Sequence, residues 1–310
     1  MRLLVNRKVV QGPWGGGNKF VRGIYEHAHE FGVDIVSEMS SNIDAALMIN
    51  PYPGDLGIGI NEIIRLKMSN PKIKLIHRVN DHDFSRIPYD GRNDNINIEC
   101  SKYCDGTVFV SDWVKNYYQE KSWHCENLSI IHNGVDKSIF KKSHNKISKT
   151  NKKINIVSHH WSTNEGKGFK IYEALDEFCQ KNNDKFTFTY IGRHPNRFKH
   201  SKVVKPLFGV ELGNELSKYD LYVSASRYES GPNHVLEALA CDIPVLITEE
   251  SGGGLEFVDS ENHFSDWPSL EEKILSSDYT TEINYQPYSM KDCVGKYVEY
   301  IKGLINEPRY

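Results

Sequence analysis

The chain has 310 residues, a length that predicts about two domains. Its 38 basic residues nearly balance its 41 acidic residues, and the formal charge of -3 argues against a broad polyanion-binding face and so against nucleic acid as a partner. Hydrophobic residues make up 39% of the chain, which is enough for a large buried core and excludes a disordered protein.

The sequence indicates a cytoplasmic protein. No stretch approaches the ~18 consecutive apolar residues of a membrane span, although peripheral contact with a membrane stays open. Charges at Arg2, Arg7 and Lys8 interrupt the start of the chain too early for a secretory signal. The six cysteines form no Cys-x2-Cys pair, so we expect reduced cysteines that mostly serve packing. Nothing indicates the oligomeric state.

Short apolar runs alternate with helical periodicity along the first half of the chain, a pattern typical of βαβ units around a parallel sheet. Strands are expected at 3–6, 45–49, 73–77, 106–110 and 128–131, and helices at 20–31, 60–68 and 113–119. The segment 141–153 that follows is polar apart from Ile147, which predicts an interdomain linker.

The same alternation resumes after the linker. Strands are expected at 154–157, 186–191, 221–224 and 245–247, and helices at 169–179, 235–240 and 290–305. We therefore expect an α/β chain of two Rossmann-like domains whose parallel sheets face across a cleft. Its N-terminal domain would span 1–145 and its C-terminal domain 146–288, with a last helix at 289–310 packing back on the N-terminal domain. Ligands of such sheets bind at the carboxyl ends of the strands, where chemistry is expected.

The densest motif lies at 219–254. A strand there ends in small polar residues, Gly231-Pro232 makes a turn, and a helix begins near Pro232. A helix N-terminus at the carboxyl end of a strand presents backbone N–H groups and a partial positive charge, which suit a diphosphate. Glu237, five residues into the helix, is placed to accept hydrogen bonds from ribose hydroxyls. Glu229, in the preceding loop, is expected closer to a bound sugar.

At these residues the chain resembles the retaining glycosyltransferases of the GT-B fold, family 4 type. Glu229 and Glu237 form the Glu-x7-Glu pattern of that family, and 238–245 and 131–136 are similar to two of its further segments. The resemblance implies the two-domain GT-B architecture, with Glu237 on the donor ribose and Glu229 on the transferred sugar. It also implies binding of sugar hydroxyls or diphosphate oxygens by the backbone around Pro232, Asn233 and His234.

A second motif, at 158–169, follows the first strand of the C-terminal domain. The family places an arginine and a lysine here to neutralise the departing diphosphate. Lys167 matches the lysine, whereas His160 or Ser162 stands near the place of the arginine. Arg193, at the end of the next strand, is a candidate for the missing charge.

Two motifs of the N-terminal domain are less specific. Gly16 and Gly17 belong to a glycine-rich stretch at 12–18 that resembles the family's loop facing the diphosphate or acceptor, since glycines let a backbone approach a ligand closely. A simple turn is the alternative reading. Asp81, with Asn80 before it, stands where the family faces the transferred sugar or the acceptor. Asp81-His82-Asp83 also matches the Asp-x-Asp metal motif of GT-A enzymes, but those lack a second Rossmann half, so no metal site is expected.

The sequence therefore predicts a glycosyltransferase that moves a sugar from a nucleotide-diphosphate sugar to a hydroxyl of a glycan, a lipid or a small molecule. The resemblance implies retention of configuration, no metal, no cofactor beyond the donor, and a catalytic set of Glu229, Lys167 and Asp81. A nucleotide-sugar 2-epimerase and an inverting transferase with Asp81 or His82 as base are alternatives within the fold. From another class, a nucleotide-sugar-binding protein without catalysis is favoured by the absent arginine and the short first domain.

Overall fold

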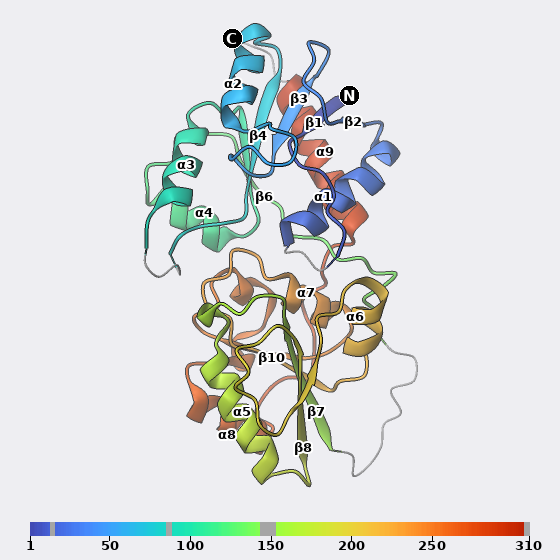
Figure 1. Ribbon diagram of the computed structural model, residues 1–310, viewed down its shortest axis with the longest axis vertical. Coiled ribbons are helices and arrows are strands. Elements are labelled where there is room, and N and C mark those ends of the chain that lie inside the picture. The colour runs from blue at the N-terminus through green and yellow to red at the C-terminus, as the bar shows by residue number, and fades with distance from the viewer. Residues whose placement is uncertain (13–15, 85–88, 143–152, 307–310) are drawn as a thin grey trace. The chain divides into compact units, whose positions relative to one another are not determined.

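The computed structural model describes residues 1–12, 16–84, 89–142 and 153–306 (Figure 1). The chain divides into two compact units: unit 1 comprises Met1–Gly134 and Tyr288–Tyr310, and unit 2 comprises Val135–Pro287. Val135 and Phe140 pack in the core of unit 2. The chain thus enters unit 2 before the polar segment 141–153, most of which lies outside the described residues.

Unit 1 is built on a six-stranded sheet of order β2-β1-β3-β4-β5-β6 in which all neighbouring strands are parallel. Its strands are β1 (Arg2–Val5), β2 (Asp34–Val36), β3 (Ala45–Met48), β4 (Lys74–Val79), β5 (Gly106–Phe109) and β6 (Leu128–Ile130). Its helices are α1 (Gly16–His27), η1 (Ala28–Phe31), α2 (Ile60–Ser69), α3 (Arg92–Ser101), α4 (Asp112–Gln119) and α9 (Met290–Asn306).

Both faces of this sheet are covered, as the apolar sequence of β3 requires. Ala45 and Leu47 belong to one core cluster with residues of α1 and α9, whereas Ala46 and Met48 belong to another with residues of α2. Successive side chains of a strand point to opposite faces, so helices pack on either side. Figure 1 shows α9, from the end of the chain, beside α1.

Unit 2 repeats this plan, with an all-parallel sheet of order β12-β11-β10-β7-β8-β9. Its strands are β7 (Ile154–His160), β8 (Phe186–Gly192), β9 (Lys202–Val204), β10 (Leu221–Ser224), β11 (Val245–Thr248) and β12 (His263–Phe264). Its helices are η2 (Glu165–Lys167), α5 (Phe169–Lys181), α6 (Gly209–Leu216), α7 (Asn233–Ala240), η3 (Gly253–Phe257), η4 (Ser260–Asn262) and α8 (Trp267–Ser276).

Several elements differ from the sequence expectation. The single helix expected at 20–31 is α1, which begins at Gly16, followed by the 3-10 turn η1, because Gly32 ends the segment in a left-handed conformation with φ 71°. The regular elements that the periodicity does not indicate are β2, α3, β9, α6, β12 and α8. No helix among the described residues has the length and apolar character to cross a bilayer. All six cysteines are unpaired thiols, and five are buried.

Candidate functional site

The candidate site of unit 2 lies at the carboxyl ends of β7 and β10, which are neighbours in the sheet. β7 ends in His159 and His160, and β10 ends in Ser224. The loop that leaves β10 carries Glu229 and leads directly into α7. Strand order therefore brings the two motifs of the C-terminal half to one edge, where ligands of parallel sheets bind.

Lys167 is held at this edge by a turn that depends on a glycine. Gly168 ends η2 in a left-handed conformation with φ 78°, and a Cβ atom on it would overlap the carbonyl oxygen of Ala225. The backbone N–H of Arg227 also donates to the carbonyl of Gly166, at 2.8 Å. The turn after β7 thus packs against the loop after β10, and Lys167 meets that loop.

Lys167 forms an ion pair with Glu229. Its Nζ donates a short hydrogen bond to Oε1 of Glu229, and each side chain is 20% exposed. Burial raises the pKa of the Glu229 carboxyl, but the charge of Lys167 and the hydrogen bonds to the carboxylate outweigh that effect and lower the pKa to about 2. The site therefore holds an ionised carboxylate at physiological pH.

The backbone of Glu229 is fixed as well. Its N–H donates to the carbonyl of Ser251 and its carbonyl accepts from the N–H of Gly253, both at 2.8 Å. Gly252, between these partners, has φ 71°, a conformation that favours glycine. The loop after β10 is therefore clamped to the loop after β11, which positions the carboxylate.

Glu237 is almost completely buried, at 2% exposure, on α7. Its Oε2 lies 3.0 Å from Nε2 of His159, whose Nδ1 lies 3.1 Å from the hydroxyl of Tyr222. A carboxylate only accepts, so Nε2 carries a proton, and the Tyr222 hydroxyl also accepts from the backbone N–H of His159 at 3.1 Å. His159 and Tyr222 thus fix the orientation of the Glu237 carboxylate.

Two further histidines pack beside this pair. The rings of His160 and His234 lie 4.6 Å apart, and their Nε2 atoms are hydrogen-bonded to Tyr172 at 2.9 Å and to Ser224 at 3.0 Å. Burial lowers the pKa of His234 to about 3 and holds the pKa of His160 well below its usual value. Both rings are therefore neutral at pH 7, and Lys167 is the cation beside them.

The N-terminus of α7 is suited to an anion. The helix begins at Asn233, after Pro232, with no side-chain cap and no acidic residue in its first turn. The N–H of Val235 donates to the carbonyl of Pro232 at 3.1 Å, whereas the N–H groups of Asn233 and His234 keep their donor capacity. Ser251 adds a hydroxyl that is buried and has no hydrogen-bond partner among the described residues. A Cβ on Gly254 would contact both Ser251 Oγ and, at 3.2 Å, Pro232, which places that hydroxyl by the helix start.

Arg193, predicted to supply the missing charge, follows β8 and is exposed. Its guanidinium lies 5.9 Å from the ring centre of Trp161, and within the described part of the chain it makes no ion pair. The structure brings together Lys167, Glu229, Glu237, His234 and the α7 start, but it shows no bond from Arg193 to them.

The site residues predicted in unit 1, Asp81, Gly16 and Gly17, belong to two separate segments of the chain. Asp81 follows β4; its Oδ1 accepts from the N–H of His82 at 2.9 Å. Gly16 and Gly17 open α1, where a Cβ on Gly17 would meet no atom within 4 Å, so packing within unit 1 does not require this glycine. Residues 13–15 of the glycine-rich stretch lie outside the described residues.

Asp83, the second aspartate of the Asp-x-Asp match, is fully buried and bonded to the start of α3. Its carboxylate accepts from the backbone N–H groups of Asn93 at 2.6 Å and Asp94 at 3.1 Å. In the described ranges, no group of three or more His, Cys, Asp or Glu side chains is placed to hold a metal ion.

Sequence reasoning missed the roles of His159, Tyr222 and Ser224. In the sequence the histidines are scattered, and only the pairing of β7 with β10 assembles them. The one available signal was that His159 comes directly before His160, which with Ser162 stands near the place of the family arginine.

Residues 152–275, which make up most of unit 2, match the family described as glycosyl transferases group 1. No curated protein matches the chain at a significant level. The resemblance that the motifs carry is thereby confirmed for this unit at the level of the group, whereas the match does not test the family 4 subtype.

Solved structures extend the likeness to both units. HepE of Anabaena in complex with UDP is 14% identical, with a TM-score of 0.72 over 97% of this chain and 99% of that one. A glycosyltransferase of Rickettsia africae is 16% identical, with a TM-score of 0.66 over 99% of each chain. The pneumococcal O-GlcNAc transferase GtfA, in complex with UDP and GlcNAc, is 13% identical with a TM-score of 0.60.

The fold follows from these likenesses. The match to GtfA takes in 85% of this chain but only 57% of the longer GtfA chain. At such identities the comparison concerns the fold, which is the two-domain Rossmann-like GT-B architecture expected from the sequence.

Proposed function

We propose that this chain is a glycosyltransferase whose unit 2 binds a nucleotide-diphosphate sugar. The enzyme transfers the sugar from this donor to a hydroxyl group of an acceptor. The observation that carries the proposal is the pairing of Lys167 with Glu229 beside the uncapped start of α7. The group 1 match spans all of these residues, and the neighbours HepE and GtfA hold UDP.

Lys167 and α7 are assigned to the diphosphate. Breaking the bond between sugar and phosphate builds negative charge on the leaving phosphate and positive character on the sugar. A fixed lysine charge and oriented N–H groups stabilise that negative charge without reorganising, which is the largest contribution in many enzymes. The buried hydroxyl of Ser251 is a further donor at the same place.

Glu229 is assigned to the transferred sugar and Glu237 to the ribose of the donor. The Glu229 carboxylate is held by partly buried Lys167 and the Glu237 carboxylate by buried His159, so their oxygens are oriented before a substrate arrives. Such preorganisation reduces the ordering cost of binding. His160 and His234 beside them are neutral, and Lys167 supplies a charge directed at the phosphate.

The finer assignments rest on the family resemblance. We propose retention of anomeric configuration and activity without a metal, with the acceptor's proton taken up by the leaving phosphate. Asp81 of unit 1 is assigned to the acceptor or transferred sugar.

The test is an assay of the full chain with a panel of nucleotide sugars and acceptors, with and without EDTA. We expect transfer with a retained anomer, unchanged by EDTA. Nucleotide-sugar binding without turnover of any donor would instead identify a non-catalytic binding protein. An epimerised nucleotide sugar or an inverted product would each identify the corresponding alternative enzyme.

A further inference from the structure

A pair of histidine rings in unit 2, His160 and His234, lies beside the groups assigned to the donor. His160 ends β7 and His234 is the second residue of α7. Their ring centres are 4.6 Å apart. Side chains of a helix lean toward its N-terminus, so the His234 ring lies at the same end of α7 as the backbone N–H of His234, which keeps its donor capacity. The ring therefore lies at the helix start, where an anion is expected.

Each ring of this histidine pair has one bonded nitrogen. Nε2 of His160 lies 2.9 Å from the hydroxyl of Tyr172, and Nε2 of His234 lies 3.0 Å from the hydroxyl of Ser224. In the described part of the chain, Nδ1 of neither ring has a hydrogen-bond partner. His160 is only 5% exposed, and polar groups of buried side chains are nearly always hydrogen-bonded. The pair thus lacks a partner that a ligand can supply.

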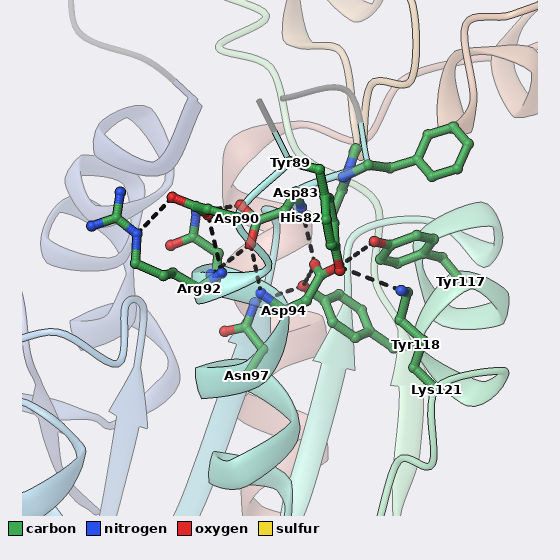
Figure 2. Close-up of polar contacts among 12 residues, drawn as sticks. His82, Asp83, Tyr89, Asp90, Arg92, Asp94, Asn97, Tyr117, Tyr118 and Lys121 are labelled. Atoms are coloured by element: carbon green, nitrogen blue, oxygen red, sulfur yellow. Dashed lines mark hydrogen bonds and ion pairs between the residues drawn. The ribbon is translucent and has the colours of Figure 1, made fainter. Parts of the chain in front are cut away.

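A buried cluster of unit 1 shows the opposite case (Figure 2). The carboxylate of Asp94, 1% exposed, accepts from three phenol hydroxyls and lies near a lysine: Tyr89 at 3.2 Å, Tyr117, Tyr118 at 3.2 Å, and Nζ of Lys121 at 3.6 Å. Partners within the fold therefore hold this charge, and it requires no ligand. The histidine pair differs because its Nδ1 atoms have no such partners among the described residues.

The charges that face His234 are already matched with one another. Lys167 is ion-paired with Glu229, and Glu237 accepts from the proton-bearing Nε2 of His159. The diphosphate of a nucleotide sugar carries two negative charges, and these pairs leave no excess of positive charge to neutralise them. A further cation beside Lys167 would complete the neutralisation.

Two further rings face His234 and do not supply this cation. The rings of His159 and Tyr222 both lie 6.1 Å from that of His234, centre to centre. Burial holds the pKa of Tyr222 well above its usual value, so this phenol stays neutral. The Nε2 proton of His159 is directed at Glu237 rather than at a phosphate.

His234 is better placed than His160 to gain the charge. Burial lowers the pKa of His234 to about 3, but the carboxylates of Glu229 and Glu237 act in the opposite direction, and the side chain is only half-buried. His160 is buried, and burial together with His234 and Lys167 holds its pKa well below the usual value. Like charges on rings 4.6 Å apart disfavour each other, so the pair is expected to gain one proton.

We propose that His234 takes up a proton when the diphosphate of the donor binds, and so becomes a second cation beside Lys167. Both nitrogens of a charged imidazole donate. The hydroxyl of Ser224 accepts from Nε2, and a phosphate oxygen accepts from Nδ1, the atom that has no partner in the described part of the chain. The proton comes from solvent, and no bond of the donor is broken on binding. The proposal rests on the proposed function, because it takes the ligand to be a nucleotide-diphosphate sugar.

Protonation and binding are linked, so each strengthens the other. A nearby anion raises the pKa of a histidine, whereas the free His234, with a pKa of about 3, is neutral at pH 6. The diphosphate of a nucleotide sugar does not itself titrate near neutral pH. Proton uptake at pH 6 is therefore a property of the complex, and the affinity rises as the pH falls.

Isothermal titration calorimetry of the full chain, in buffers of different ionisation enthalpy, counts the protons taken up per ligand bound. The probes are UDP-glucose, UDP-N-acetylglucosamine and GDP-mannose, and the tightest binder is titrated at pH 6 and pH 8. We expect uptake of about half a proton at pH 6 and less at pH 8, with an affinity that rises about threefold per pH unit near pH 6.

His234→Gln should reduce this uptake to near zero and remove most of the pH dependence of the affinity. The matched control His29→Gln, at an exposed position of η1, should keep both. A second measurement uses the wild type alone. In NMR spectra of the histidine-labelled full chain, one imidazole signal should titrate at a higher pH with the nucleotide sugar than without it.

The proposal is overturned if the wild type binds a nucleotide sugar without proton uptake. It is also overturned if His234→Gln keeps the wild-type uptake, since another group then takes the proton. Failure of every nucleotide sugar to bind would overturn the proposed function as well, whereas binding without proton uptake would leave that function in place.

Discussion

Lys167 and Glu229 are 62 residues apart in the chain, yet they form an ion pair at the carboxyl edge of the unit 2 sheet. The pair keeps an ionised carboxylate and a cation together in a partly buried place, where each is costly alone. In the proposed reaction the lysine faces the departing phosphate and the glutamate faces the sugar. The positive lysine then stabilises the negative charge that develops on the phosphate, and the negative glutamate stabilises the positive character that develops on the sugar.

Replacing Lys167 with alanine is predicted to lower kcat/KM by about 10²- to 10³-fold, the cost of about 2.7–4 kcal/mol for a lost transition-state donor. Steady-state kinetics with the donor identified by the panel measures this effect. Lys170→Ala, an exposed lysine three residues on in α5, is the matched control and should retain activity. An unchanged kcat/KM in Lys167→Ala would remove this lysine from the site.

Glu229→Gln is predicted to reduce kcat by about 10- to 100-fold, because a charged hydrogen bond is worth about 1.5–3 kcal/mol. The amide has nearly the same shape and still offers an oxygen to Lys167, so circular dichroism should show an intact fold. Glu211→Gln, at an exposed carboxylate in the first turn of α6, controls for lost negative charge in unit 2. Near-normal turnover in Glu229→Gln would refute the assigned role.

Much of this fold could be predicted because its elements carry their own periodicity. β10 is a run of four buried residues, and α7 has five buried residues, among them Val235 and Leu239. α3 carries no such signal, since its buried residues include Asp94, Asn97 and Ser101. It is a helix because tertiary partners satisfy these polar groups, and a single sequence does not reveal those partners.

The same limit applies to the site. Lys167, Glu229 and Glu237 were recognised from motifs, but their contacts depend on strand order. Leu221 pairs with Ile156 and Tyr222 with Val157, which brings β7 beside β10. This pairing is non-local, so the neighbours of Glu237 could not be read from spacing.

The half-buried histidine His234 makes unit 2 sensitive to acid. Its pKa is about 3 in the folded chain against an ordinary value of 6.5, so between these values the unfolded chain binds a proton that the folded chain does not. The free energy of unfolding therefore falls as the pH drops below about 6.5, by at most about 1.4 kcal/mol per pH unit for this group. His160, whose pKa is also lowered, acts in the same direction.

Urea unfolding at pH 7 and pH 5 measures this loss. His234→Gln should lose about 2 kcal/mol less than the wild type over that interval, since the imidazole with the lowered pKa no longer contributes. His29→Gln, at an exposed position of η1, should lose as much as the wild type. Equal losses in His234→Gln and wild type would contradict a neutral His234.

His159 is predicted to be a positioning residue that affects binding of the nucleotide-sugar donor by orienting Glu237. His159→Ala removes the group 3.0 Å from Oε2 of this buried carboxylate. We expect the free energy of unfolding to fall by about 1–3 kcal/mol, the cost of an unsatisfied buried group, and the KM for the donor to rise about tenfold with a smaller change in kcat. His159→Gln, which keeps a hydrogen-bond donor at this position, should recover part of the lost stability and part of the affinity for the nucleotide sugar.

A double-mutant cycle distinguishes positioning from a direct contact with the substrate. If His159 acts by orienting the carboxylate of Glu237, His159→Ala should change the donor KM little once Glu237 is already glutamine. A full effect of His159→Ala in the Glu237→Gln background would mean that the imidazole contributes independently. Because Tyr222 holds the other ring nitrogen at 3.1 Å, Tyr222→Phe should show a weaker form of the same KM effect through the same chain of contacts.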